Sequence, residues 1–138
     1  MANTAQTILI VDDESGLRAL LRTILEEENY KVFDAENGVT AIDILNKERI
    51  DMVISDIRMP NMDGIQLGIH CKENYPGMPF ALISGGSPEL QAADDFNYLE
   101  EGKKQAGACT VLKKPFDLDE ILSVIEDTLS QHSINKHA

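Results

Sequence analysis

The stretch Thr7-Ile8-Leu9-Ile10-Val11 is a continuous apolar run that ends at two carboxylates, Asp12 and Asp13. Apolar residues at successive positions, rather than at every second one, are typical of a strand that is buried on both faces. Such strands occur in parallel sheets that have helices packed on both sides. This run therefore favours an α/β domain.

Strand-like and helix-like segments alternate along the rest of the chain. Further strands are predicted at 30–35, at 52–54 with its end at Asp56, at 80–83 and at 109–112. One-sided apolar stripes predict helices around 17–25 and at 118–129, and apolar residues mark another around 41–45. A further helix is predicted over about 63–74, where Pro76-Gly77 stops it. Five strand–helix units in 138 residues predict a doubly wound, five-stranded parallel sheet.

The whole chain, residues 1–138, is interpreted as one domain with its core at about 7–130. Residues 85–93 are expected to form a long loop and 94–106 a short helix, although their apolar residues keep no steady period. Residues 131–138 are expected to form a short, frayed tail, with no output domain.

The composition narrows the class of partner. A net charge of -12, with 12 basic and 24 acidic residues, predicts no direct contact with nucleic acid or with anionic membranes. No apolar run is long enough to cross a membrane, and the polar start of the chain lacks the pattern of a secretory signal. Cys71 and Cys109 fit no metal-binding spacing and are interpreted as free thiols, which indicates a cytoplasmic protein.

Polar side chains follow four of the predicted strands. Asp12 and Asp13 follow the first strand, Asp56 ends the third, Ser84 follows the fourth and Lys114 the fifth. In a parallel α/β sheet, ligands bind beyond the carboxyl ends of the strands. We therefore expect three carboxylates, one hydroxyl and one ammonium group to meet at one edge.

Three carboxylates repel one another unless a cation lies between them. Mg²⁺ takes oxygen ligands and is usually held by one or two carboxylates together with water and phosphate oxygens. An aspartate beside such a metal is suited to form an aspartyl phosphate. The metal, Lys114 and Ser84 would then bind the non-bridging phosphoryl oxygens.

Each residue also has a simpler interpretation. Asp12 or Asp13, taken alone, fits an N-cap of the following helix. Lys114-Pro115 fits a turn, and Ser84 alone indicates nothing. A phosphoryl site is favoured because all of these residue types occur together, each at the end of a predicted strand.

Four segments together resemble the signatures of the CheY-like receiver family of two-component response regulators. They are Val11–Glu14, Ser55–Gly64, Ile83–Gly85 and Leu112–Phe116. The resemblance covers about residues 7–130. It implies a flavodoxin-like strand order, 2-1-3-4-5, with five helices.

The resemblance also implies roles for individual residues. Asp56 would accept a phosphoryl group from a sensor histidine kinase or a histidine phosphotransfer protein. Asp13, Asp56 and the backbone carbonyl of Arg58 would bind Mg²⁺ directly, while Asp12 would act largely through water. Lys114 would sense the phosphate, and Ser84 would be the switch hydroxyl.

A protein of this kind is a phosphoprotein switch rather than a conventional turnover enzyme. The chain is interpreted as a stand-alone response regulator that signals through phosphorylation-dependent contacts with an unidentified downstream protein. Three alternatives remain open: a relay intermediate, a pseudo-receiver scaffold that is never phosphorylated, and an α/β hydrolase using Asp12 and Glu14.

Two positions depart from the family pattern. Val111 occupies the place where family members often carry Tyr or Phe, so a ring rotation cannot report phosphorylation there. The segment 85–93 makes the stretch between Ser84 and Lys114 longer than is typical. We hypothesise that phosphorylation orders this segment and shifts the short helix after it.

The two adjacent lysines are predicted to differ. Lys114→Ala should leave Mg²⁺ binding intact but blunt the conformational response to beryllofluoride, because the phosphoryl oxygens lose their cationic partner. Lys113→Ala should change that response little, as expected for a solvated charge. Amide hydrogen exchange with and without beryllofluoride measures both effects, and the opposite pattern would mean that the strand register is shifted by one residue.

Overall fold

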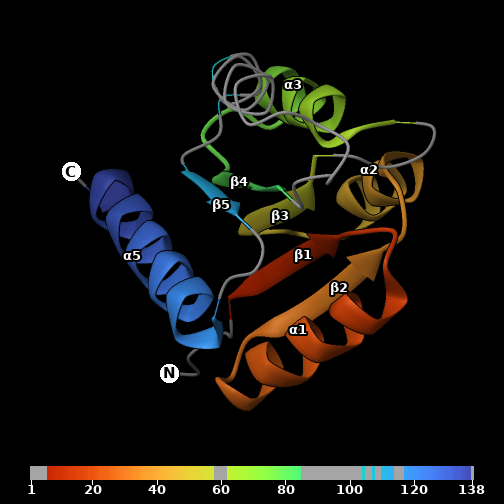
Figure 1. Cartoon of the computed structure of the whole chain (residues 1–138). Coiled ribbons are helices and arrows are strands. Elements are labelled where there is room, and N and C mark those ends of the chain that lie inside the picture. Colours follow the sequence, from red (N-terminus) through yellow and green to blue (C-terminus); the bar gives the residue numbers. More distant parts are fainter. Residues whose placement is uncertain are drawn as a thin grey trace.

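A five-stranded parallel sheet forms the centre of the protein (Figure 1). The computed structural model describes residues 6–57, 62–84, 104, 107, 110–113 and 117–137, without the side chains of 84, 110, 113 and 131–137. The strand order is β2-β1-β3-β4-β5, as the family resemblance implied. The strands are β1 (Thr7–Val11), β2 (Lys31–Ala35), β3 (Met52–Asp56), β4 (Phe80–Ser84) and β5 (Thr110–Lys113).

Within the described residues, four helices cover the two faces of this sheet. They are α1 (Ser15–Glu27), α2 (Gly38–Lys47), α3 (Gly64–Asn74) and α5 (Leu118–His137). Figure 1 shows α1 and α5 on one side of the sheet and α2 and α3 on the other. The fold is therefore the doubly wound α/β arrangement predicted from the alternating segments.

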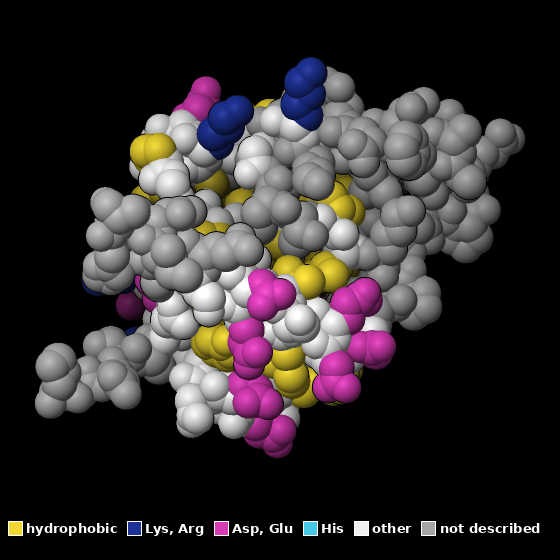
Figure 2. Space-filling model, turned by 90° about the vertical axis from the view of Figure 1, so that its left-hand side faces the viewer, with side chains coloured by type: hydrophobic (Ala, Val, Ile, Leu, Met, Phe, Trp, Pro, Cys, Tyr) yellow, Lys and Arg dark blue, Asp and Glu magenta, His cyan; other side chains and the backbone are white. Residues whose placement is uncertain are grey.

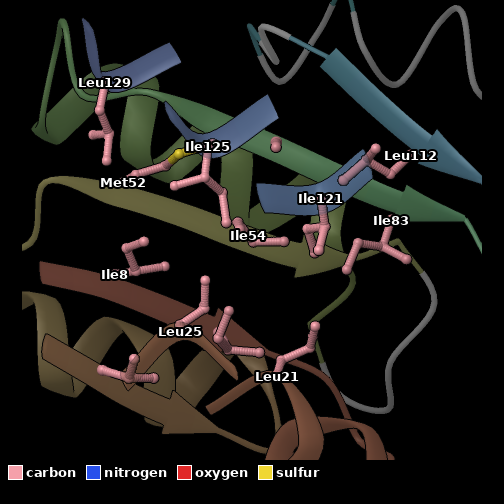
Figure 3. Packing of buried hydrophobic residues seen from close by; sticks show 13 residues of the cluster. Ile8, Leu21, Leu25, Met52, Ile54, Ile83, Leu112, Ile121, Ile125 and Leu129 are labelled. Atoms are coloured by element: carbon pink, nitrogen blue, oxygen red, sulfur yellow. The ribbon is translucent and has the colours of Figure 1, made fainter. Parts of the chain in front are cut away.

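The core is divided by the sheet into two clusters. Successive residues of a strand point to opposite faces, so Ile8 and Ile10 pack with α1 and α5, while Leu9 and Val11 pack with α2 and α3. Figure 3 shows the first cluster, in which Ile121 and Ile125 of α5 face the strands. All five residues of β1 and of β3 are buried, which explains their uninterrupted apolar runs.

Two helices begin at side chains that satisfy their first amide groups. Asn37 accepts a hydrogen bond from the backbone N–H of Thr40 at 2.9 Å and so caps α2. At α3, Asp63 accepts from the N–H of Gln66 at 2.8 Å, and the Gln66 side chain accepts from the N–H of Asp63 at 3.1 Å. This reciprocal pair is a capping box, and it fixes the first turn of α3.

The predicted strands are all confirmed within one or two residues at each end. The third predicted helix, 63–74, agrees with α3. The expectation of a frayed tail is wrong for 131–137, because the backbone of α5 continues as a helix to His137. The predicted loop 85–93 lies outside the described residues, as does the predicted helix 94–106 except for Lys104, which is helical.

Acidic side chains gather on the side of the molecule that carries α5, in the lower half of the view in Figure 2. Glu28, at the end of α1, and Glu126 of α5 are both near Tyr30. Burial raises the pKa of the Tyr30 hydroxyl, and the two carboxylates raise it further. No described helix combines the length and the hydropathy that a membrane span requires.

Cys71 of α3 is 2% exposed, and its burial raises the pKa of the thiol to about 12 from an ordinary value of 9.0. We predict that Cys71 in the folded protein resists alkylation at about pH 8 and reacts after unfolding, because the thiolate is the reactive form. Peptide mapping by mass spectrometry checks this.

The same shift predicts a pH dependence of stability. Between about pH 9 and pH 12 the unfolded chain releases the Cys71 proton while the folded chain retains it, so the free energy of unfolding falls as pH rises. Denaturant unfolding at several pH values should show a shallower fall for Cys71→Ala than for the wild type. Equal slopes would contradict the buried, protonated thiol.

Candidate functional site

Three aspartates meet at the carboxyl-terminal edge of the central strands. Asp12 and Asp13 follow β1, and Asp56 is the last residue of β3. Val11 pairs with Ser55 in the parallel register of these strands, so the aspartates that follow them lie side by side. One carboxylate oxygen from each of the three residues lies within 4.8 Å of the others. The structure thus brings together three of the residues that the sequence predicted.

Hydrogen bonds to neighbouring strands hold the backbone at both aspartate-bearing strand ends. The N–H of Asp12 donates to the carbonyl of Ala35 in β2 at 3.1 Å. Asp56 pairs in register with Ile83 of β4, and the N–H of Ile57 donates to the Ile83 carbonyl at 2.9 Å. The carboxylates of Asp12 and Asp56 are therefore carried by backbone that is bonded to the sheet, as a preorganised site requires.

Asp12 and Asp56 differ in exposure. Asp12 is fully buried, and its Oδ1 accepts a hydrogen bond from the N–H of Glu14 at 2.8 Å. Asp56 is 7% exposed, and Asp13 is exposed. The N-cap of α1 is Glu14, which makes no side-chain capping bond, so the alternative of Asp12 or Asp13 as the N-cap is wrong.

Gly64 approaches the backbone of Asp56 more closely than any other residue type could. A Cβ atom at Gly64 would collide with the carbonyl oxygen of Asp56 and would lie 2.9 Å from its carbonyl carbon. The N–H of Gly64 also donates to the carbonyl of Ile57 at 2.7 Å. α3 therefore begins directly against the end of β3, and glycine is required there because it has no side chain.

Gly64 falls at the start of the helix predicted over 63–74, but the sequence analysis did not identify its role at the site. The available signal was its position directly after a capping aspartate, at the first residue of a helix. Glycine is a poor helix former, so its presence there indicates close approach to other backbone.

The donor set fits a hard divalent cation. All three groups offer carboxylate oxygens, the ligand type that Mg²⁺ takes in proteins. Three carboxylates at this separation also repel one another, and a bound cation turns that repulsion into attraction. The described part of the site can thus hold Mg²⁺.

The other predicted residues are described less completely. Ser84 ends β4 and pairs in register with Lys113, the last residue of β5. Arg58 and Lys114 lie outside the described residues. Val111 is partly buried and packs against the cluster that contains Leu82.

Sheet order and site together define a class: a doubly wound α/β domain with an acidic, metal-competent edge. The family model described as "Response regulator receiver domain" matches residues 8–126. The chain therefore belongs to the receiver domains of two-component response regulators, a family in which Mg²⁺ binding and phosphorelay signalling are typical.

Two curated relatives differ greatly in length. Sporulation initiation phosphotransferase F of Bacillus subtilis is 36% identical over 90% of this chain and 94% of its own length. Transcriptional regulatory protein GlrR of Escherichia coli is 38% identical over 95% of this chain. The chain spans 28% of GlrR, so it resembles one part of that regulator.

Solved structures agree with this assignment. A CheY-like receiver domain protein from Methanospirillum hungatei superposes with a TM-score of 0.82 at 25% identity, over 96% of this chain and 99% of the other. The receiver domain of NtrX from Brucella abortus gives a TM-score of 0.79 at 28% identity, over 89% and 98%. These proteins share the fold of the present chain.

The contact at Gly64 predicts the effect of one added methyl group. Gly64→Ala should lower the free energy of unfolding by about 1–3 kcal/mol, because backbone must move to relieve the overlap. The shifted backbone also carries the Asp56 carboxylate, so Gly64→Ala should slow phosphoryl labelling if Asp56 is the acceptor, as proposed below. Denaturant unfolding and labelling with a small phosphodonor measure the two effects.

Gly16→Ala is the matched control. Gly16 lies in the first turn of α1, and a Cβ there would meet nothing within 4 Å. This change should leave labelling unchanged and should not destabilise the protein, because alanine is the better helix former. If Gly64→Ala behaves like Gly16→Ala, the close approach is of no consequence for the site.

Proposed function

We propose that Asp56 accepts a phosphoryl group from a sensor histidine kinase or a histidine phosphotransfer protein. The observation that carries the proposal is the convergence of Asp12, Asp13 and Asp56 within 4.8 Å at the strand ends. Asp56 is the best acceptor of the three. It retains some exposure, whereas Asp12 is fully buried and bonded to the Glu14 amide, and Asp13 lies out in the loop after β1.

The reaction is a transfer between two nucleophiles. A carboxylate oxygen of Asp56 forms a bond to phosphorus while the phosphorus–nitrogen bond of the donor phosphohistidine breaks, and the imidazole leaves with its electron pair. Catalysis of such a transfer consists mainly of positioning and charge stabilisation. The register of β1 and β3 supplies the positioning, because it fixes the acceptor beside its acidic neighbours.

The remaining groups of the site are proposed to stabilise the negative charge that gathers on the phosphoryl oxygens. Mg²⁺, when bound, neutralises part of that charge. We assign Asp13, Asp56 and the backbone carbonyl of Arg58 as its direct ligands, with Asp12 acting through water. Lys114 and Ser84 are proposed to contact phosphoryl oxygens, which fits the adjacent positions of β4 and β5 at the same edge.

The phosphorylated domain is proposed to act through contacts with another protein. Receiver domains interact with histidine kinases or phosphotransfer proteins, and the family is not one of conventional enzymes. The proposed readout involves residues 85–106, where the fifth helix of the family pattern is expected. The relative that matches over 94% of its own length is itself little longer than a receiver domain.

A second candidate function is that of a relay intermediate. The relative from Bacillus subtilis is called a phosphotransferase, which indicates onward transfer of the phosphoryl group. The two candidates differ in the fate of that group. Incubation of the phosphorylated chain with a histidine phosphotransfer protein separates them, because a relay loses its phosphoryl group to that histidine.

We predict that Asp56→Asn abolishes phosphorylation by acetyl phosphate and Mg²⁺, because the amide is not nucleophilic. The fold should remain, since the amide keeps the shape of the side chain and relieves repulsion from Asp12 and Asp13. Intact mass measures the added phosphoryl group, and circular dichroism checks the fold.

Asp127→Asn, at an exposed position of α5, is the matched control. This variant should be phosphorylated to the same extent as the wild type. Excess chelator should reduce labelling of the wild type and of this control alike. Stoichiometric labelling of Asp56→Asn at another residue would refute the assignment of the acceptor.

A further inference from the structure

Arg18 connects α1 to the loop that carries two of the site carboxylates. Its Nη1 donates to the backbone carbonyl of Asp12 at 2.6 Å. Its Nε lies 3.9 Å from a carboxylate oxygen of Asp34 in β2, and the side chain is 18% exposed. The short contact to the carbonyl is a charge-assisted hydrogen bond, whereas the longer ion pair is weak.

The bonded carbonyl belongs to the peptide that joins Asp12 to Asp13. A peptide is planar, so fixing its carbonyl oxygen fixes the orientation of the whole unit. Rotation of this unit would change the directions in which the two flanking side chains leave the backbone. Arg18 therefore acts on the relative placement of the two carboxylates through the backbone that carries them.

Three further hydrogen bonds hold the backbone of residues 12–14. The N–H of Asp12 is held by the Ala35 carbonyl, and the N–H of Glu14 is held by Oδ1 of Asp12. Glu14 also accepts, through its backbone carbonyl, from the N–H of Arg18 at 3.1 Å. With the bond from its side chain, Arg18 closes a ring of contacts around the Asp12–Asp13 peptide.

We propose that Arg18 is a positioning residue of the metal site, which it serves by orienting the Asp12–Asp13 peptide. The proposal rests on Mg²⁺ binding by Asp12, Asp13 and Asp56, as set out above. Replacing a residue that orients metal ligands without binding the metal itself typically changes metal affinity by 10- to 100-fold.

Charge alone predicts the opposite effect. Arg18 is a cation near a cation site, so its removal would tighten Mg²⁺ binding if only Coulombic repulsion mattered. Loss of orientation weakens binding instead. The sign of the change therefore distinguishes a positioning residue from a nearby charge.

The experiment is a Mg²⁺ titration of the isotopically labelled protein, followed through its amide resonances. Arg18→Gln should raise the Mg²⁺ dissociation constant by about tenfold. In the absence of metal, the same variant should show faster exchange of the Glu14 amide hydrogen, because the carboxylate that accepts from it is less well placed. Arg18→Lys, whose ammonium group can still donate to the Asp12 carbonyl, should restore part of the affinity.

Arg22→Gln is the matched control. Arg22 lies one turn further along α1 and pairs with Asp34 at 3.2 Å and with Glu26 at 3.3 Å, contacts that do not involve Asp12. The Arg22→Gln variant removes the same charge from the same helix. It should change the Mg²⁺ dissociation constant by less than about twofold, as expected for exposed ion pairs. Similar melting temperatures for the variants would confirm that each remains folded.

Three results would overturn the positioning role: unchanged or tighter Mg²⁺ binding in Arg18→Gln, an equal loss in Arg22→Gln, or no recovery in Arg18→Lys. A wild-type protein that shows no response to Mg²⁺ would refute the metal site itself, and the positioning role with it. The Glu14 amide, measured without metal, shows separately whether Arg18 orders the loop.

Discussion

The parallel pairing of β1 with β3 is the constraint on which the site depends. Val11 lies opposite Ser55, and the chain therefore places Asp12 beside Asp56 at the next position of both strands. Carboxylates this close would separate in a flexible chain, because each disfavours the charge of the other. Two fully buried strands and the helices on both faces hold them together, so the free energy of folding maintains an arrangement that suits a cation.

The fold was largely predictable because its signals are local. Apolar stretches gave the strands, even in β2, where Lys31 and Asp34 flank Val32 and Phe33. Apolar spacing and the Pro76-Gly77 stop gave α1, α2, α3 and the first part of α5. The order of the strands could not be predicted in this way, because periodicity does not say which strands pair. That order came from the family resemblance. The extent of α5 was underestimated because the apolar stripe in the sequence ends at Leu129, while the helical backbone continues to His137.

The site was predictable where residue type and strand end coincide, as they do at Asp12, Asp13 and Asp56. It was not predictable where function depends on backbone approach or on a long side chain. Arg18 and Arg22 look equivalent on the polar side of α1, yet one of them reaches the Asp12 carbonyl and the other reaches Glu26. Arg18 lies one turn nearer the start of α1, and which group its side chain meets depends on how the helix start is placed beside β1, which no single-sequence pattern encodes.

The division of the core by the sheet has a consequence for how such a domain can diverge. Neighbouring residues of one strand, such as Val53 and Ile54, belong to different clusters on opposite faces of the sheet. Effects of substitutions in separate clusters tend to be additive. Compensating changes can then accumulate beneath α1 and α5 without repacking α2 and α3. The acidic edge touches both layers, so one phosphorylation chemistry can be retained while either helical surface acquires new partners.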